Sequence, residues 1–367
     1  MESCIKHSLL VFFYLICLSF FVAAVEAVTK PRPFNNKVSA VLVFGDSTVD
    51  SGNNNYVDTL FKGNFPPYGR DFRGQNPTGR FSNGRLTTDF IASYAGVKDF
   101  VPPYLDPTLT TQELLTGVSF ASAGSGFDPL TPELSSVISM PDQLEYFREY
   151  KKKLVLAIGK KRTEEHIKRA VFLVGAGTND FVVNYFTLPV RRKTYSVTDF
   201  EKFILQLVTD FIQGLWEEGA RRIAVSGLPP MGCLPVVITL NSNNAILNRG
   251  CVGQYSQVAM EYNKKLQKEL NLMRNNLVNQ GAKIFYFDIF NPLVYLIQGP
   301  GKSEFDDVSQ GCCGTGFLEA GFLCNPKSYV CSDASKYVFF DSIHPTEKTY
   351  FRVFEAGRGV IDLLIKD

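Results

Sequence analysis

Four short apolar runs constrain the fold of this chain more than any other feature. Each is rich in Val, Ile or Phe and apolar on both faces, which is typical of a parallel strand that helices cover on both sides. A fifth run is weaker. In chain order the runs are residues 38–44, 117–120 (the weaker one), 170–174, 221–225 and 282–287.

Helical patterns separate these runs. Apolar residues recur at helical spacing over 198–219, and Thr198 and Glu201 form a capping-box pair at the start of that predicted helix. A long helix is expected over 255–279 and a final one after Pro345. The alternation of strands and helices predicts an α/β fold, with a mainly parallel sheet between helices.

The N-terminal sequence has the pattern of a secretory signal peptide. An apolar run from Leu9 to Val25 ends in small residues, so residues 1–27 are predicted to be a signal peptide that is removed. The alternative, a membrane anchor, is disfavoured because the run is short for a bilayer. Residues 28–37 would then be an N-terminal extension and 38–367 a single domain. No later segment is long and apolar enough to span a membrane, so the mature protein is expected to be soluble.

Cysteine usage agrees with secretion. An even number of cysteines remains after the signal, which predicts disulfides, and six cysteines allow 15 connectivities. A zinc site is disfavoured because the spacings do not fit one. No glycosylation sequon occurs in the chain. The six are Cys233, Cys251, Cys312, Cys313, Cys324 and Cys331.

Charge and motifs exclude several classes of function. The net charge of +2 and the lack of a basic stripe disfavour a nucleic-acid partner. The chain has no P-loop, dinucleotide fingerprint, zinc-protease motif or Gly-x-Ser-x-Gly, and no cofactor or metal is expected. Residues 63–85 form a long loop with four arginines, which is either functional or a solvated basic surface.

Polar, glycine-containing turns follow three of the predicted strands. They contain Ser47, Gly124 and Asn179. Ligands of open α/β sheets bind at the carboxyl ends of the strands, so these three turns are expected to meet at one edge. A single turn of this kind would be an ordinary surface turn.

A serine nucleophile at Ser47 would need a base, and histidine is the usual one. Of the two histidines that follow the signal, His166 lies in a charged stretch and is expected to be exposed. His344 follows Asp341 by three residues, a spacing at which the carboxylate could orient the imidazole. The alternative is that Asp341 and His344 only cap the final helix.

Acyl transfer also needs donors for the developing oxyanion. The candidates are the backbone N–H groups of Ser47 and Gly124 and the side-chain amide of Asn179. The alternatives are a plain turn glycine and an Asx turn.

Four blocks of the sequence together resemble the signature blocks of the GDSL esterases and lipases, within the SGNH hydrolases. The resemblance implies a flavodoxin-like, three-layer α/β/α fold and ester hydrolysis through an acyl-serine. It makes Ser47 the nucleophile, His344 the base and Asp341 its orienter, with Ser47, Gly124 and Asn179 as the oxyanion hole. The blocks are Phe-Gly-Asp-Ser47, Phe-Ala-Ser-Ala-Gly124, Gly-Thr-Asn179-Asp and Asp341-Ser-Ile-His344-Pro.

Three further stretches resemble the plant-type branch of this family: Asp50-Ser51-Gly52-Asn53-Asn54, Leu228-Pro-Pro-Met-Gly-Cys233 and Gly311-Cys-Cys-Gly314. This resemblance implies a secreted, extracellular enzyme of the apoplast or cell wall acting on a small-molecule or lipid ester. One position departs from the pattern: Thr48 stands where the family's name-giving leucine would be. An acyltransferase would carry the same motifs, and a catalytically silent binding protein would lack one of them. Natural substrate, acyl chain length and oligomeric state stay open.

Overall fold

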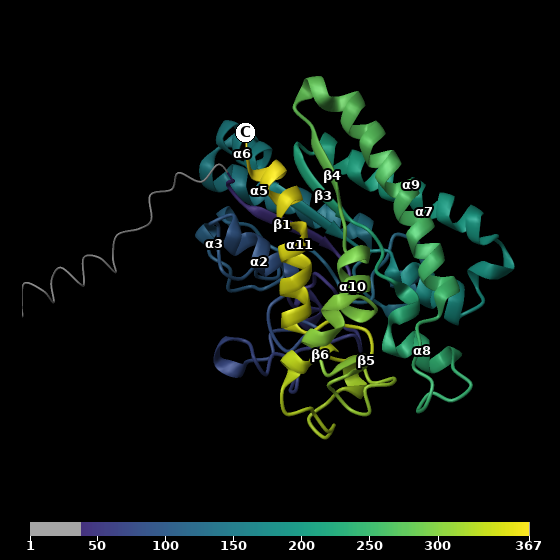
Figure 1. Cartoon of the computed structure of the whole chain (residues 1–367). Coiled ribbons are helices and arrows are strands. Elements are labelled where there is room, and N and C mark those ends of the chain that lie inside the picture. The colour runs from purple at the N-terminus through teal and green to yellow at the C-terminus, as the bar shows by residue number, and fades with distance from the viewer. Residues whose placement is uncertain (1–37, 367) are drawn as a thin grey trace, which may run out of the picture. The chain divides into compact units, whose positions relative to one another are not determined.

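The four stronger apolar runs are the four strands of one sheet. The strands lie in the order β1-β2-β3-β4, and each pairs in parallel with its neighbour (Figure 1). Their bounds differ from the predicted ones by one residue, except that β1 begins three residues later. The strands are β1 Val41–Gly45, β2 Val171–Gly175, β3 Arg222–Ser226 and β4 Lys283–Phe287.

This computed structural model describes residues 38–366, which belong to one compact unit. The predicted signal peptide (1–27) and the whole of the N-terminal extension (28–37) lie outside the described residues. Within the described part, no helix has the length and apolar character needed to cross a bilayer.

The weaker fifth run lies beside β1. The Val43 N–H donates to the Val118 carbonyl at 3.0 Å, and the Phe120 N–H donates to the Val43 carbonyl at 2.7 Å. The segment forms isolated parallel bridges rather than a regular strand. Counted with it, the spatial order is 2-1-3-4-5 in chain numbering, which is the flavodoxin-like order.

Alternate residues of the strands face two helical layers. One face of the sheet packs on α5, α7 and α9, and the other packs on α2, α10 and α11. Figure 1 shows α2 and α11 together in front of the strands. The three-layer α/β/α architecture that the resemblance implies is therefore present. The helices are α2 Thr87–Tyr94, α3 Thr111–Leu115, α4 Leu130–Ser135, α5 Met140–Ile158, α6 Lys160–Arg169, α7 Val197–Glu217, α8 Pro235–Asn241, α9 Gly253–Leu277, α10 Phe290–Ile297 and α11 Glu347–Ile365.

The predicted capping box of α7 is wrong. Ser196 caps this helix, and its side chain accepts from the Asp199 N–H. Thr198 already lies in the first turn. The Glu201 side chain is buried and pairs with Lys265 of α9, so a tertiary ion pair overrides the local capping pattern.

All six cysteines of the described chain form disulfides: Cys233–Cys251, Cys312–Cys331 and Cys313–Cys324. The last two lie within residues 311–332, which we call the cystine segment. It begins at the end of β5 (Asp307–Gly311), which pairs with β6 (Tyr337–Phe339). This small sheet lies at the N-terminal end of α11 in Figure 1.

Candidate active site

Ser47 lies just beyond the carboxyl end of β1, at a sharp turn. Gly45 has φ +143°, and a Cβ at that position would lie 1.9 Å from the Gly175 carbonyl oxygen. Only glycine fits such a conformation and such a close approach. The Asp46 N–H then donates to the same carbonyl at 2.9 Å, which turns the chain and leaves Ser47 at the edge of the sheet.

The structure brings Ser47, His344 and Asp341 into one hydrogen-bonded line. The Ser47 Oγ lies 2.7 Å from His344 Nε2, and His344 Nδ1 lies 2.7 Å from Asp341 Oδ2. Because a carboxylate only accepts, Nδ1 carries the proton and Nε2 is free to accept from the serine hydroxyl. All three side chains are buried, with Ser47 the most exposed at 8%.

A tight turn, and not a helix, sets the Asp341–His344 spacing. Asp341 Oδ1 accepts from the backbone N–H groups of Ile343 and His344, at 2.8 and 2.7 Å. The N-cap of α11 is Thr346, whose side chain accepts from the Thr349 N–H. The capping interpretation of Asp341 and His344 is therefore wrong.

His166 lies elsewhere in the fold. It is on α6, just before β2, and therefore at the amino ends of the strands, opposite Ser47. The predicted exposure is wrong: the ring is half-buried and its Nε2 has no partner among the described residues. Burial, aided by Arg169, lowers the pKa of His166 to about 4, so the ring is neutral near pH 7.

Gly124 and Asn179 belong to neighbouring turns. The Asn179 Nδ2 donates to the Ser125 carbonyl at 2.9 Å, and Gly124 has φ +88°. Within the described chain, the N–H groups of Ser47 and Gly124 donate to no protein acceptor. The amide of Asn179 carries a second proton that the Ser125 carbonyl does not use.

The asparagines that follow Ser47 bind the Gly124 turn to the Ser47 turn. The Asn53 side-chain amide donates to the carbonyls of Ser119 and Ala121, and the Asn54 amide donates to the Ala123 carbonyl. The Asp50 carboxylate accepts from the Ala123 N–H at 3.0 Å. These side chains are buried, so Asn53 and Asn54 are internal, and their amides satisfy backbone carbonyls of the segment beside β1.

The Asp180 carboxylate binds the Asn179 turn to a neighbouring segment in the same way, through buried hydrogen bonds. It begins the π-helical segment Asp180–Thr187 and is fully buried. Its carboxylate accepts from the backbone N–H groups of Phe127 and Asp128 and from the Thr131 hydroxyl. Burial raises the pKa of Asp180 to about 7. The sequence contained Asp180 in a recognised block, but nothing in the block predicted these partners.

The loop over residues 63–85 is not a solvated basic surface. Arg80 is buried and makes two hydrogen bonds to the Asp89 carboxylate of α2, at 2.9 and 2.8 Å. Arg70 donates to the carbonyls of Cys331 and Ser332. The Tyr68 hydroxyl of the same loop lies 2.6 Å from Asp341 Oδ2. The loop therefore reaches the site directly.

An apolar cavity of about 100 Å³ lies between the sheet and the α2–α11 layer. Its wall includes Thr48 and Ile343, which adjoin Ser47 and His344 in sequence, and Leu173 and Phe287 from the sheet. Thr48 donates its hydroxyl to Asp46 Oδ1 at 2.7 Å. A leucine at position 48 could not make this bond, so the departure from the family pattern has a local role.

Comparison with known proteins identifies the family. The profile of the GDSL-like lipase/acylhydrolases matches residues 41–356. The chain belongs to the GDSL lipase/acylhydrolase family. A GDSL esterase/lipase of Arabidopsis thaliana is 62% identical over 330 residues, which are 90% of this chain and 88% of the relative.

Two further GDSL esterase/lipases of Arabidopsis thaliana are similar along most of their length. One is 47% identical over 85% of this chain and 87% of its own length. The other is 43% identical over 89% of each chain. This GDSL-family chain is accordingly a serine ester hydrolase of α/β fold.

Proposed function

We propose that Ser47 is the nucleophile with which this hydrolase opens carboxylic esters. His344 takes the serine proton on Nε2, and Asp341 holds the imidazole in the tautomer that leaves Nε2 free. The observation that carries the proposal is the unbroken line from Ser47 Oγ to Asp341 Oδ2, with both hydrogen bonds at 2.7 Å.

The reaction then has two halves. Ser47 Oγ attacks the ester carbonyl, and the oxyanion that forms receives hydrogen bonds from the N–H groups of Ser47 and Gly124 and from the Asn179 amide. The imidazolium of His344 gives its proton to the leaving alcohol. His344 then takes a proton from water as the water attacks the acyl-serine, and the imidazolium returns that proton to Ser47 Oγ as the carboxylic acid is released.

The cavity between the sheet and the α2–α11 layer supports a substrate with an apolar acyl group. Its walls are mainly apolar and include Thr48 and Ile343, the sequence neighbours of Ser47 and His344. Burial of each methylene is worth about 0.8 kcal/mol, which corresponds to a gain of roughly fourfold in kcat/KM per carbon until the cavity is full. We infer a small-molecule or lipid ester with such a chain.

We further propose that the enzyme is secreted and acts in the apoplast or cell wall. The N-terminal sequence has the pattern of a signal peptide. The three disulfides are compatible with an oxidising compartment.

Hydrolysis of a chain-length series of nitrophenyl esters by the secreted, disulfide-intact protein tests the proposal. Ser47→Ala is expected to lower kcat by at least about 10⁴-fold. Ser51→Ala is the matched control, because Ser51 is buried four residues away and its hydroxyl has no partner in the described chain. It is expected to keep wild-type activity.

A serine-directed phosphonate provides a second readout. Mass analysis should find the adduct on Ser47 in the wild type and in Ser51→Ala, and on no residue of Ser47→Ala. A folded Ser47→Ala protein that turns over esters at the wild-type rate would show that another group is the nucleophile.

A further inference from the structure

Tyr68 connects the 63–85 loop to the candidate site. Its ring is buried, with 1% of its surface exposed, and packs against Phe81 and Phe340 with centroid distances of 5.4 and 5.6 Å. The Phe81 ring in turn packs against the His344 ring, with their centroids 4.8 Å apart. A loop that sequence patterns could not assign therefore forms part of the wall around the imidazole.

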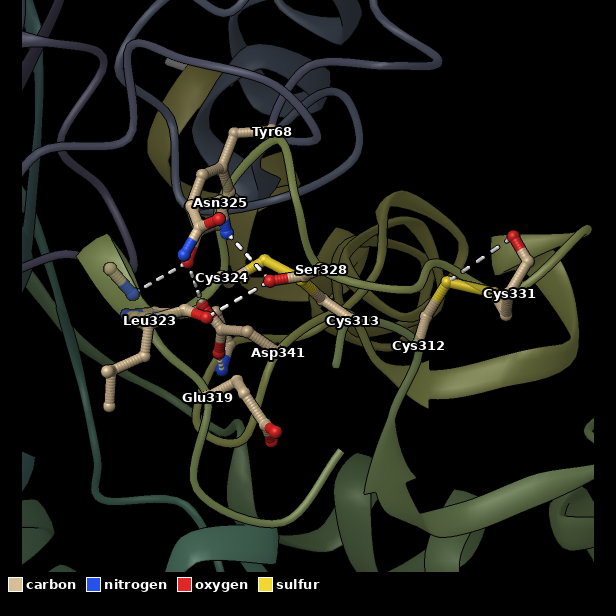
Figure 2. Close-up of a disulfide and its surroundings, with 12 residues drawn as sticks. Tyr68, Cys312, Cys313, Glu319, Leu323, Cys324, Asn325, Ser328, Cys331 and Asp341 are labelled. Atoms are coloured by element: carbon tan, nitrogen blue, oxygen red, sulfur yellow. Dashed lines mark hydrogen bonds and ion pairs between the residues drawn. A yellow bond between two sulfur atoms is a disulfide. The ribbon is translucent and has the colours of Figure 1, made fainter. Parts of the chain in front are cut away.

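The direction of the Tyr68 hydrogen bonds is fixed by their partners. The Gly321 N–H, in the cystine segment, can only donate, and it donates to the Tyr68 Oη at 2.8 Å. The hydroxyl proton therefore goes to Asp341 Oδ2, at 2.6 Å. Figure 2 shows Tyr68 reaching toward Asp341 beside the Cys313–Cys324 disulfide. Burial, followed by the charge of Asp341, raises the pKa of Tyr68 well above its usual value, so the hydroxyl remains a donor.

The same carboxylate oxygen serves two donors. Asp341 Oδ2 accepts from Tyr68 Oη and from His344 Nδ1, while Oδ1 accepts from two backbone N–H groups. A hydrogen bond to an ionised carboxylate is about twice as strong as a neutral one, and it withdraws charge from the acceptor. The Tyr68 hydroxyl therefore weakens the electrostatic attraction between the Asp341 carboxylate and the protonated His344 imidazole.

We propose that Tyr68 is a positioning residue that fixes the Asp341 carboxylate and sets the lowest pH at which His344 can accept the serine proton. The proposal rests on the catalytic roles proposed above for His344 and Asp341. It assigns the 63–85 loop a specific task, which is to deliver one hydroxyl group to the Asp–His pair.

Other charged groups face the pair and must be held constant. Asp46 interacts electrostatically with His344, and the charges of Asp341 and Asp46 both act on the Tyr350 hydroxyl. A Tyr68→Phe substitution leaves these groups and the aromatic packing in place. The comparison between variant and wild type therefore reports on the Tyr68 hydroxyl.

The test is the pH profile of kcat and KM for a nitrophenyl ester. Tyr68→Phe is expected to move the acid limb of the kcat profile to higher pH by roughly half to one pH unit. It is also expected to lower kcat at the optimum by roughly 3- to 10-fold with KM little changed. An acid limb that stays in place, or moves to lower pH, would overturn the proposal even when Ser47→Ala is inactive.

The matched control is Tyr150→Phe. Tyr150 is as buried as Tyr68, and its hydroxyl donates to the Leu114 carbonyl at 2.8 Å, far from Ser47. Tyr150→Phe loses one hydroxyl hydrogen bond and Tyr68→Phe loses two, so both variants are expected to lose thermal stability, the Tyr68 variant more. Only Tyr68→Phe should change the pH profile.

A second variant keeps the proposal testable if Tyr68→Phe does not fold. Replacement of Tyr68 by 3-fluorotyrosine retains the ring and strengthens the hydroxyl as a donor. The acid limb should then move to lower pH, the opposite direction to Tyr68→Phe. A shift in the same direction for both variants would contradict the proposed role.

Discussion

Two buried aspartates, one bonded to His344 and one following Asn179, accept similar numbers of hydrogen bonds, yet they differ in what donates to them. Asp341 accepts from two backbone N–H groups and from the side chains of His344 and Tyr68. Asp180 accepts from two backbone N–H groups and one hydroxyl, that of Thr131. One carboxylate therefore contacts a group that changes its protonation state, and the other contacts only groups that do not.

The difference separates two requirements of the proposed reaction. On the histidine flank, which comprises Asp341, His344 and the cystine segment, a proton must move, so charge and tautomer matter. On the amide flank, which comprises residues 122–131 and 179–184, donors must stay still while charge develops. Asp180 and the buried asparagines supply that rigidity.

The largest effect is expected on the histidine flank. Asp341→Asn would place an amide N–H opposite His344 Nδ1, so Nδ1 would become the acceptor and Nε2 would carry the proton. In that tautomer His344 cannot accept from Ser47. We expect kcat to fall by roughly 10⁴-fold, measured with a nitrophenyl ester under saturating conditions.

The matching substitution on the other flank is the control. Asp180→Asn also exchanges a buried carboxylate for an amide, but it changes no tautomer, so its loss of kcat should be far smaller. Equal losses in two folded variants would show that burial of an acid, and not the histidine contact, explains the effect of Asp341.

A smaller effect is expected from the amide flank. Asn179→Ala removes one of the three proposed oxyanion donors and is expected to lower kcat by about 10²- to 10³-fold. Asn325→Ala is a control, because the Asn325 side-chain amide also donates to a backbone carbonyl, that of Phe322, at 3.1 Å. Its kcat should be unchanged. An unchanged kcat in folded Asn179→Ala would refute the assigned role.

The histidine flank was more predictable from sequence than the amide flank. Only two histidines follow residue 27, and the three-residue spacing of Asp341 and His344 is local, so a single turn can realise it. The four strands were equally predictable from the sequence, because burial on both faces requires a continuous apolar run. These predictions needed no knowledge of distant contacts.

Distant contacts explain what could not be predicted. Tyr68 and Asp341 are 273 residues apart, and the loop that carries Tyr68 has no periodicity to place it. Glu201 was assigned to a cap, but its partner is Lys265, which lies on another helix. Disulfide pairing likewise depends on the fold, since six cysteines are compatible with 15 connectivities by sequence alone.

The smallest expected effect concerns the pH dependence of stability that Asp180 causes. The ordinary pKa of the Asp180 carboxyl is 3.8, and burial raises it to about 7 in the folded protein. The folded state therefore binds this proton more tightly than the unfolded state does. The stability that results is fully present below about pH 4 and is lost as the pH rises through about 7. Asp180→Asn removes this dependence.

Thermal unfolding of the disulfide-intact proteins between about pH 5 and pH 8 measures the difference. The midpoint of wild type should fall more steeply with pH than that of Asp180→Asn, with the gap between the two changing by roughly 2–5 °C. Because burial also raises the pKa of Asp50, to about 6, the variant keeps part of the slope. Asp199→Asn is the control: the Ser196 hydrogen bond lowers the pKa of this exposed carboxyl, so its contribution is constant over the range. Parallel profiles for wild type and Asp180→Asn would mean that Asp180 stays ionised throughout this pH range.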